Sequence, residues 1–366
     1  MRIALKLVLH AVGQVVLLAV GLLAISALPI LYVETRCQSL PQSTADTTPR
    51  VVTELPWRRP EVNSYLSYPE WYIVHAYEDL AGVLKTSDEH AYSYTASILG
   101  FWSSLCDITT RTTQQRATPG DMKAMLYIIG VSFTAEMIVK GAWEETIGRA
   151  SAWWRGPEKN AEDRFASGVA DRYAAFLTQT PWYQFPFAST VAQFWRETPF
   201  GSRSIIRSLE RRVALSAEWG VKAGHAVLIG QAAGLSPADL RIRSVVAGLA
   251  AADLAAMPGI TVVSEPAGGV LIETDRYRAF TDIARQVVAK GGRFTEIAGN
   301  RRALVTLVIP MKDQLAVPGA QRLFGFIVQA RPGWQRIGLD VPVERLGDAM
   351  QAASREGGSF EHLYDY

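Results

Sequence analysis

The pattern of apolar and polar positions divides the chain into four segments. Residues 7–33 contain no Asp, Glu, Lys or Arg, whereas residues 34–60 are rich in Pro, Ser, Thr and Arg and show no periodicity. Residues 61–257 carry apolar side chains at helical spacing, and residues 258–366 contain short β-branched runs separated by Gly pairs. We therefore predict a membrane anchor (1–33), a linker (34–60), a helical domain (61–257) and an α+β domain (258–366).

The uncharged segment is long enough to cross a bilayer. At about 1.5 Å per helical residue it covers about 40 Å, more than the roughly 30 Å of a hydrocarbon core. A cleaved signal peptide is the competing interpretation, but Ile25 occupies the −3 position relative to Ala27, where a small residue is needed. We expect an uncleaved anchor whose basic end, with Arg2 and Lys6, lies in the cytoplasm.

This orientation predicts a protein of the bacterial inner membrane with its body in the periplasm. A GC-rich bacterial genome also accounts for the predominance of Arg, which supplies 29 of the 37 basic residues. Cys37 and Cys106 are too few for a disulfide scaffold. They either pair with each other, or Cys106 is simply buried in a helix.

The stretch YPEWYIVHAYEDL begins at Tyr68 and is predicted to be helical. Ser67 and Glu70 have capping-box spacing at its start. Trp71, His75 and Glu78 fall on the side opposite the apolar stripe, so we expect them on a solvated or contact surface. His75 and Glu78 have the spacing of metal ligands, but a second Glu-x-x-His is missing, and we predict no metal site.

The longest helix of the body is predicted to begin at the capping sequence 118–121 and to continue to about Trp154, and in residues 122–143 apolar side chains surround the whole axis. Glu136 and Lys140 are spaced for an i, i+4 ion pair. Two charges near the centre of a lipid-facing helix are costly, which favours the central helix of a soluble bundle. A second membrane span remains the alternative.

Nine of the ten tryptophans lie between Trp57 and Trp219. They either fill the core of the helical domain or form a surface for the membrane interface or for an apolar ligand such as a lipid or quinone, with Trp182 as the candidate residue. Nearby, Arg203, Arg207 and Arg211 recur at every fourth position. This stripe is either a solvated face or a binding site for lipid phosphates.

The last segment contains strands and helices in alternation. Predicted strands cover 260–264, 270–274, 293–297, 303–309, 323–329, 335–341 and 360–363, and predicted helices lie at 280–288 and 342–355. Their order resembles a ferredoxin-like β-α-β-β-α-β sandwich with an inserted hairpin, a resemblance of fold that implies no activity. No internal repeat is evident in the sequence.

The sequence lacks the common catalytic and phosphate-binding motifs. It contains no G-x-S-x-G, HExxH or phosphate-binding glycine motif, and we predict no catalytic residue and no cofactor. A net charge of +2 gives no reason to expect nucleic acid as a partner. We expect an anchored binding or assembly factor that contacts the bilayer through its N-terminal helix. An enzyme or carrier for an apolar ligand and a small-molecule or metal sensor are the alternatives.

Overall fold

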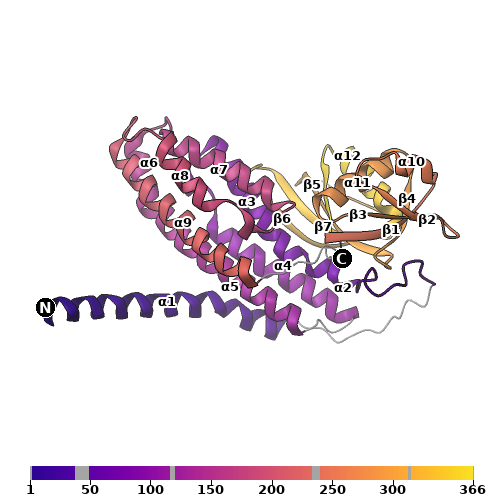
Figure 1. Ribbon diagram of the computed structural model, residues 1–366, viewed down its shortest axis with the longest axis horizontal. Coiled ribbons are helices and arrows are strands. Elements are labelled where there is room, and N and C mark those ends of the chain that lie inside the picture. Colours follow the sequence, from indigo (N-terminus) through magenta and orange to yellow (C-terminus); the bar gives the residue numbers. More distant parts are fainter. Residues whose placement is uncertain (1, 38–48, 116–119, 233–239, 312–314, 366) are drawn as a thin grey trace.

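The computed structural model describes residues 2–37, 49–115, 120–232, 240–311 and 315–365 (Figure 1). A long N-terminal helix, a bundle of helices and a part with two β-sheets follow one another along the chain. The helix α1 (Arg2–Arg36) extends away from the other two parts, and the sheets lie at the opposite side of the bundle. The predicted order of an apolar helix, a helical region and an α+β region is therefore confirmed.

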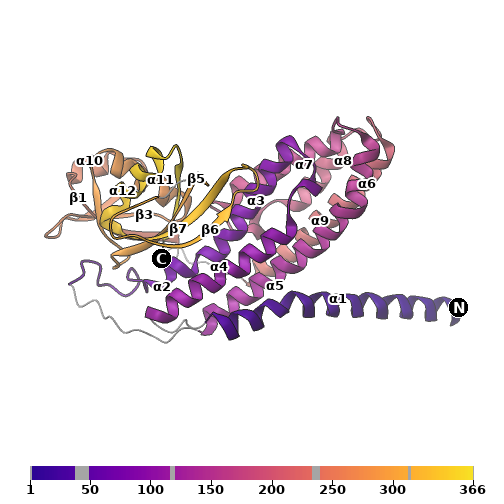
Figure 2. The same ribbon diagram turned by 180° about the vertical axis from the view of Figure 1, so that it is seen from behind.

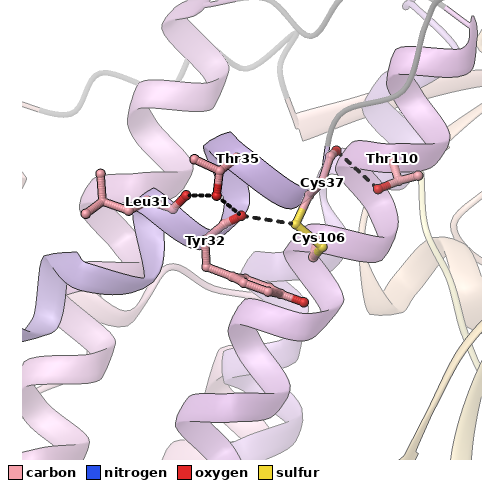
Figure 3. The surroundings of a disulfide bond; sticks show 6 residues. All are labelled: Leu31, Tyr32, Thr35, Cys37, Cys106 and Thr110. Atoms are coloured by element: carbon pink, nitrogen blue, oxygen red, sulfur yellow. Dashed lines mark hydrogen bonds between the residues drawn. A yellow bond between two sulfur atoms is a disulfide. The ribbon is translucent and has the colours of Figure 1, made fainter.

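Among the side chains of α1 that the structure describes, those near its C-terminal end are the ones that pack on the rest of the molecule. Val33 and Cys37 are buried there, whereas Leu17 and Leu18 are each 73% exposed. A disulfide joins Cys37 to Cys106 of α4 (Tyr94–Gln115), and the Thr110 hydroxyl donates to the Cys37 carbonyl at 3.1 Å (Figure 3). An exposed apolar helix and a disulfide fit anchoring in a membrane or secretion.

The helical bundle is built from long helices connected by short turns. Its elements are α2 (Val62–Leu66), α3 (Tyr68–Thr86), η1 (Glu89–Ala91), α4, α5 (Gly120–Trp143), the π-helical turn η2 (Glu144–Gly148), α6 (Arg149–Arg155), α7 (Ala161–Leu177), η3 (Trp182–Gln184), α8 (Phe187–Glu197) and α9 (Ile205–Ala232). The predicted long helix is confirmed, since α5, η2 and α6 form one continuous run. Within the described residues, two helical stretches are long and apolar enough to cross a membrane, Val16–Arg36 and Met122–Arg155.

The start of α3 differs from the sequence prediction. Ser67 makes no side-chain cap, and its hydroxyl donates to the Ser64 carbonyl at 2.9 Å. Trp71 and His75, which we expected on an outer side, are 7% and 2% exposed. The reason is that α3 lies between two layers, the other helices on one side and a sheet on the other, so both of its sides are covered.

The β-rich part contains two four-stranded antiparallel sheets. Sheet A has the order β2-β3-β1-β4, with β1 (Arg241–Ala247), β2 (Thr261–Ser264), β3 (Val270–Asp275) and β4 (Arg293–Ile297). Sheet B has the order β6-β7-β5-β8, with β5 (Arg302–Pro310), β6 (Gln321–Ile327), β7 (Trp334–Pro342) and β8 (Ser359–Leu363). The short elements α10 (Ala251–Ala255) and η5 (Val343–Arg345) and the helices α11 (Arg278–Ala289) and α12 (Leu346–Arg355) complete this part.

The two sheets are copies of one topology. Each has three strands, a helix and a fourth strand, with the short α10 added between the first two strands of sheet A, and each places the first strand between the third and the fourth. A β-bulge interrupts the pairing of the first and fourth strands at the same place in both, at Val245/Val246 and at Thr306/Leu307. The sequence analysis missed this repeat because the copies share little beyond Gly-Gly-x-Phe at Gly291–Phe294 and Gly357–Phe360.

The strand arrangement corrects the ferredoxin-like prediction in its details. All seven predicted strands exist, but together with β1 they form two sheets in place of one sandwich. β1 was missed, because the alanines and leucines that follow it gave its neighbourhood a helical pattern. β1 lies before residue 258, where we predicted the second domain to begin.

One apolar core lies between the two sheets and the helices α11 and α12, and it includes Phe280, Phe294, Leu307 and Leu339. The outer side of each sheet is also covered. The helical bundle packs on sheet B, where Leu304 and Phe324 join its aromatic core. Residues 49–59, which belong to the predicted linker, pack on sheet A through Val52 and Trp57. Residues 34–36 of that linker belong to α1, and residues 38–48 lie outside the described residues.

Candidate functional site

An open groove runs between α11 and α12 above strand β8, with a volume of about 1030 Å³. Three arginines line it, Arg278 and Arg285 from α11 and Arg355 from α12. The rest of the lining is mixed: Val288, Met350 and Phe360 supply apolar surface, and Gln351, Ser354, Ser359 and Glu361 are polar. The groove therefore combines positive charge with apolar surface, a lining suited to an anion that carries an apolar group.

Glycines let the two helices and the strand come close together at this groove. A Cβ on Gly347 of α12 would lie 3.3 Å from Val288 of α11, which is tighter than most contacts. At the floor, a Cβ on Gly358 would collide with the backbone of β5. Since α12 follows β7 and the Gly357–Gly358 turn returns the chain into β8, the fold itself places these elements around one opening.

Arg285 is held in place by the end of the chain. Its Nη2 donates to the carbonyls of Phe360 at 2.8 Å and Glu361 at 3.0 Å, and it also pairs with Asp282. Arg278 shares the same Asp282 at 3.2 Å. Burial, and then the charge of Arg278, lower the pKa of Arg285. The single carboxylate of Asp282 thus pairs with two guanidinium groups, and the groove keeps a net positive charge.

Glu361 connects the groove to the interior. It is the residue that the bulge in β8 leaves without a partner across the sheet, between Phe360 and His362. Its carboxylate accepts from Arg336 Nε at 2.7 Å. Burial by itself would raise the pKa of Glu361, but Arg336, His75 and the hydrogen bond with Thr306 together outweigh this effect, and the pKa falls to about 2. Glu361 is therefore ionised at all physiological pH values.

Behind Glu361, a buried polar cluster joins sheet B to α3. His75 Nδ1 lies 2.8 Å from Glu78, and its Nε2 lies 3.0 Å from the Tyr364 hydroxyl and 3.6 Å from Glu361. Asp79 of α3 accepts from the backbone N–H of Gln329 at 3.1 Å. The cluster links the two parts of the protein through hydrogen bonds and ion pairs.

A metal ion fits these residues poorly. Donor atoms of His75, Glu78 and Glu361 lie within 4.8 Å of one another. However, the two carboxylates approach opposite nitrogens of the His75 ring, and Glu361 is already neutralised by Arg336. A second set, Asp88, Glu89 and Asp163, is bound by arginines of the bundle. We therefore propose no metal at either place.

The predicted site residues do not converge on one site. Trp71, His75 and Glu78 lie together at the interface with sheet B. Trp182 is half-buried in η3, with its ring 5.1 Å from that of His225 in α9. Of the remaining tryptophans, Trp102 and Trp219 are buried, but Trp153 and Trp154 are 79% and 65% exposed, so neither a pure core role nor a pure surface role describes them.

The arginine stripe has two environments. Arg203 is exposed and pairs with Glu158, as on a solvated face. Arg207 and Arg211 are fully buried, and they belong to neither of the two environments that we expected from the sequence. Arg207 contacts Asp163 at 2.8 Å, and it contacts Glu89 and Glu210 at 2.9 Å each.

Sequence reasoning missed the groove arginines and Glu361. Their contacts depend on the pairing of β8 with β5 and on the approach of α11 and α12, and no local pattern encodes either. Comparison with known proteins adds no assignment, because no family model, no curated protein and no solved structure matches this chain.

Proposed function

We propose that the protein is a membrane-anchored binding protein whose groove between α11 and α12 takes a small anionic ligand with an apolar group. The groove is the observation that carries this proposal. It has the volume of a small-molecule site, and its lining includes three arginines beside Val288, Met350 and Phe360. Arginine binds carboxylates and phosphates through paired N–H donors, so either group suits the anionic end.

The location of the body supports an extracytoplasmic role. In this proposal α1 crosses the bacterial inner membrane with its basic end in the cytoplasm. The disulfide between Cys37 and Cys106 lies one residue beyond the end of α1. Disulfides persist in oxidising compartments, so this end of α1 belongs on the periplasmic side.

The alternative of a carrier for a lipid or quinone in the helical bundle has less support. The cavity among α3, α5, α7 and α9 measures about 40 Å³. It has room for water but not for an apolar cofactor, since ligand sites measure about 300–1,000 Å³. Its lining also includes the charged residues Glu89, Glu144 and Arg211. The assembly role remains a second candidate, because a protein partner with an acidic, partly apolar segment has the chemistry that the groove selects.

Ligand binding can be tested on the full-length protein in detergent, with phenyl phosphate as a probe that combines an anion and an apolar ring. We expect phenyl phosphate to raise the melting temperature, because a ligand that binds only the folded state stabilises it. The double variant Arg278→Gln, Arg355→Gln should lose this shift, whereas Arg293→Gln on β4 should retain it.

Native mass spectrometry of the same preparation gives an independent measurement. A co-purified anion that is present in the parent protein and missing from the double variant supports the groove as the site. Equal thermal shifts in the parent and the double variant, or no shift together with no co-purified anion, would overturn the proposal.

A further inference from the structure

Helix α9 exposes its apolar side and buries its charged side, whereas a helix at a water-facing surface does the opposite. Its outer side consists of apolar residues, and Ile205, Leu209, Val213, Val221 and Leu228 are each more than half exposed. Its inner side holds Glu210, Arg211 and Arg212, all buried. A helix on the surface of a soluble bundle shows the opposite distribution.

Helix α5 shows the same reversal next to α9. Ile128 and Val139 are 68% and 56% exposed on its outer side. Two of its charged residues pair with α9, Glu136 with Lys222 at 2.8 Å and Lys140 with Glu218 at 2.9 Å. In the turn that continues α5, Glu144 contacts Arg211 at 2.9 Å. The charges of the two helices thus neutralise one another inside the bundle, as in proteins embedded in lipid.

The opposite side of the bundle exposes charged residues, as expected of a surface in contact with water. On α7, Arg164 and Arg172 are exposed, and Asp171 forms an exposed ion pair with Lys85 of α3 at 3.0 Å. The reversal on α5 and α9 is therefore not shared by α7 and does not reflect a generally apolar surface. An exposed apolar side of this kind marks a contact with lipid or with another protein.

The position of α1 favours lipid over another protein as the partner of this apolar side. The disulfide and the ion pair of Glu34 with Lys123, at 2.7 Å, hold the end of α1 against the start of α5. From this junction α1 and the bundle diverge, but both extend toward the same side of the molecule, so that α6 and α8 lie on the same side as the N-terminal end of α1 in both views (Figures 1 and 2). The outer side of α5 and the apolar surface of α1 therefore meet at the junction and extend in the same general direction.

The dimensions and the far end of the bundle fit a bilayer as well. The 28 residues of α9 are about 42 Å long, so its apolar outer side offers a long surface to the hydrocarbon layer. Trp153 and Trp154 are exposed at the end that lies farthest from the junction, and tryptophan is enriched where membranes meet water.

We propose that the exposed apolar side of α5 and α9, the α5–α9 face, lies in the hydrocarbon layer of the membrane beside α1. This inference rests on the anchor that is part of the proposed function. It extends the membrane contact from one helix to three, and it leaves the sheets and the polar side of α7 in water.

The inference can be tested by spin labelling of the full-length protein in liposomes of phosphatidylethanolamine and phosphatidylglycerol. Cys37 and Cys106 are disulfide-bonded, so a single added cysteine takes the label. Val213→Cys and Val221→Cys report on the α5–α9 face, Arg172→Cys on the polar side, and Leu18→Cys on the anchor. Collision with oxygen measures access from lipid, and collision with a water-soluble nickel chelate measures access from water.

We expect labels at residues 213, 221 and 18 to be quenched mainly by oxygen and the label at residue 172 mainly by nickel. Nickel-dominated quenching at 213 and 221, with 18 still in lipid, would overturn the inference and leave the anchor intact. Low access to both agents at 213 and 221 with spin–spin broadening would place a second copy on the face and overturn it as well. Nickel access at residue 18 would instead overturn the anchor.

Discussion

The imidazole ring of His362 stacks on the indole ring of Trp71, with the ring centroids 3.6 Å apart. The contact joins the last strand of sheet B to α3. His362 Nδ1 lies 2.9 Å from the Thr281 hydroxyl of α11, so the same ring also meets the helix that lines the groove. Burial, and then the neighbouring His75, lower the pKa of His362 well below 6.5, and the ring is neutral at pH 7.

A neutral buried histidine makes stability depend on pH in a defined direction. The unfolded chain binds a proton at His362 near pH 6.5, whereas the folded protein does so only at much lower pH. Its contribution to stability is therefore complete above pH 6.5 and decreases as the pH falls, by at most about 1.4 kcal/mol per pH unit. We expect His362→Gln to flatten the decline in unfolding free energy between pH 6.5 and 5. Denaturant unfolding in detergent at a series of pH values checks this, and an unchanged slope would contradict it.

The buried arginine network offers a matched pair of substitutions one helical turn apart. Arg207→Met leaves Asp163, Glu89 and Glu210 without their shared cation, and removing one partner of a buried ion pair costs about 3–5 kcal/mol. Arg203→Met removes only an exposed pair and should cost about 0–1 kcal/mol. Thermal unfolding of the two variants measures the difference. Equal losses would show that the network contributes little.

The disulfide should stabilise the attachment of α1 to the bundle. It closes a loop of 69 residues, for which the chain-entropy relation gives about 4 kcal/mol. We expect the double variant Cys37→Ser, Cys106→Ser to have a lower melting temperature than the parent, and a reducing agent to lower the melting temperature of the parent only. A parent protein whose melting temperature is insensitive to reduction would show that the bond is not formed in the membrane.

Two glycines in neighbouring strands test the packing of α3 on sheet B. A Cβ on Gly338 of β7 would overlap the ring of Phe324, which itself packs on Tyr68 with ring centroids 4.1 Å apart. Gly338→Ala should therefore cost about 1–3 kcal/mol through overpacking. Gly325→Ala on β6 meets only the flexible end of Arg322 and should cost less. Denaturant unfolding compares the two variants, and an equal cost would argue against close packing at Gly338.

Local patterns predicted most elements of the sheet-containing part. Strands such as β3 and β7 are apolar runs with turn residues at their ends, and the Gly pairs after α11 and α12 marked the helix ends correctly. The division into two sheets was not predictable in this way, because strand pairing joins residues distant in sequence, such as Val305 with Leu363. β1 was missed for a related reason, since its place is set by β3 and β4 on either side.

The sides of the helices were harder to assign than the helices themselves. Periodicity showed that Trp71 and His75 share one side of α3, but it does not show whether a second layer covers that side. The same limit applies to the arginines of α9, whose spacing places them on one side without saying whether that side faces inward. The groove was beyond prediction altogether, since Arg278, Arg355 and Glu361 meet only in the folded chain.

The segment from Pro49 to Pro60 acts as a strap across sheet A. The backbone N–H groups of Val51 and Val52 donate to Glu296 at 2.9 and 2.6 Å, and Arg243 stacks on Trp57. A truncated form that begins after Pro60 would uncover Val245 and Leu271 and invite aggregation. Anyone preparing a version without the N-terminal helix for crystallisation should therefore start it at or before Pro49.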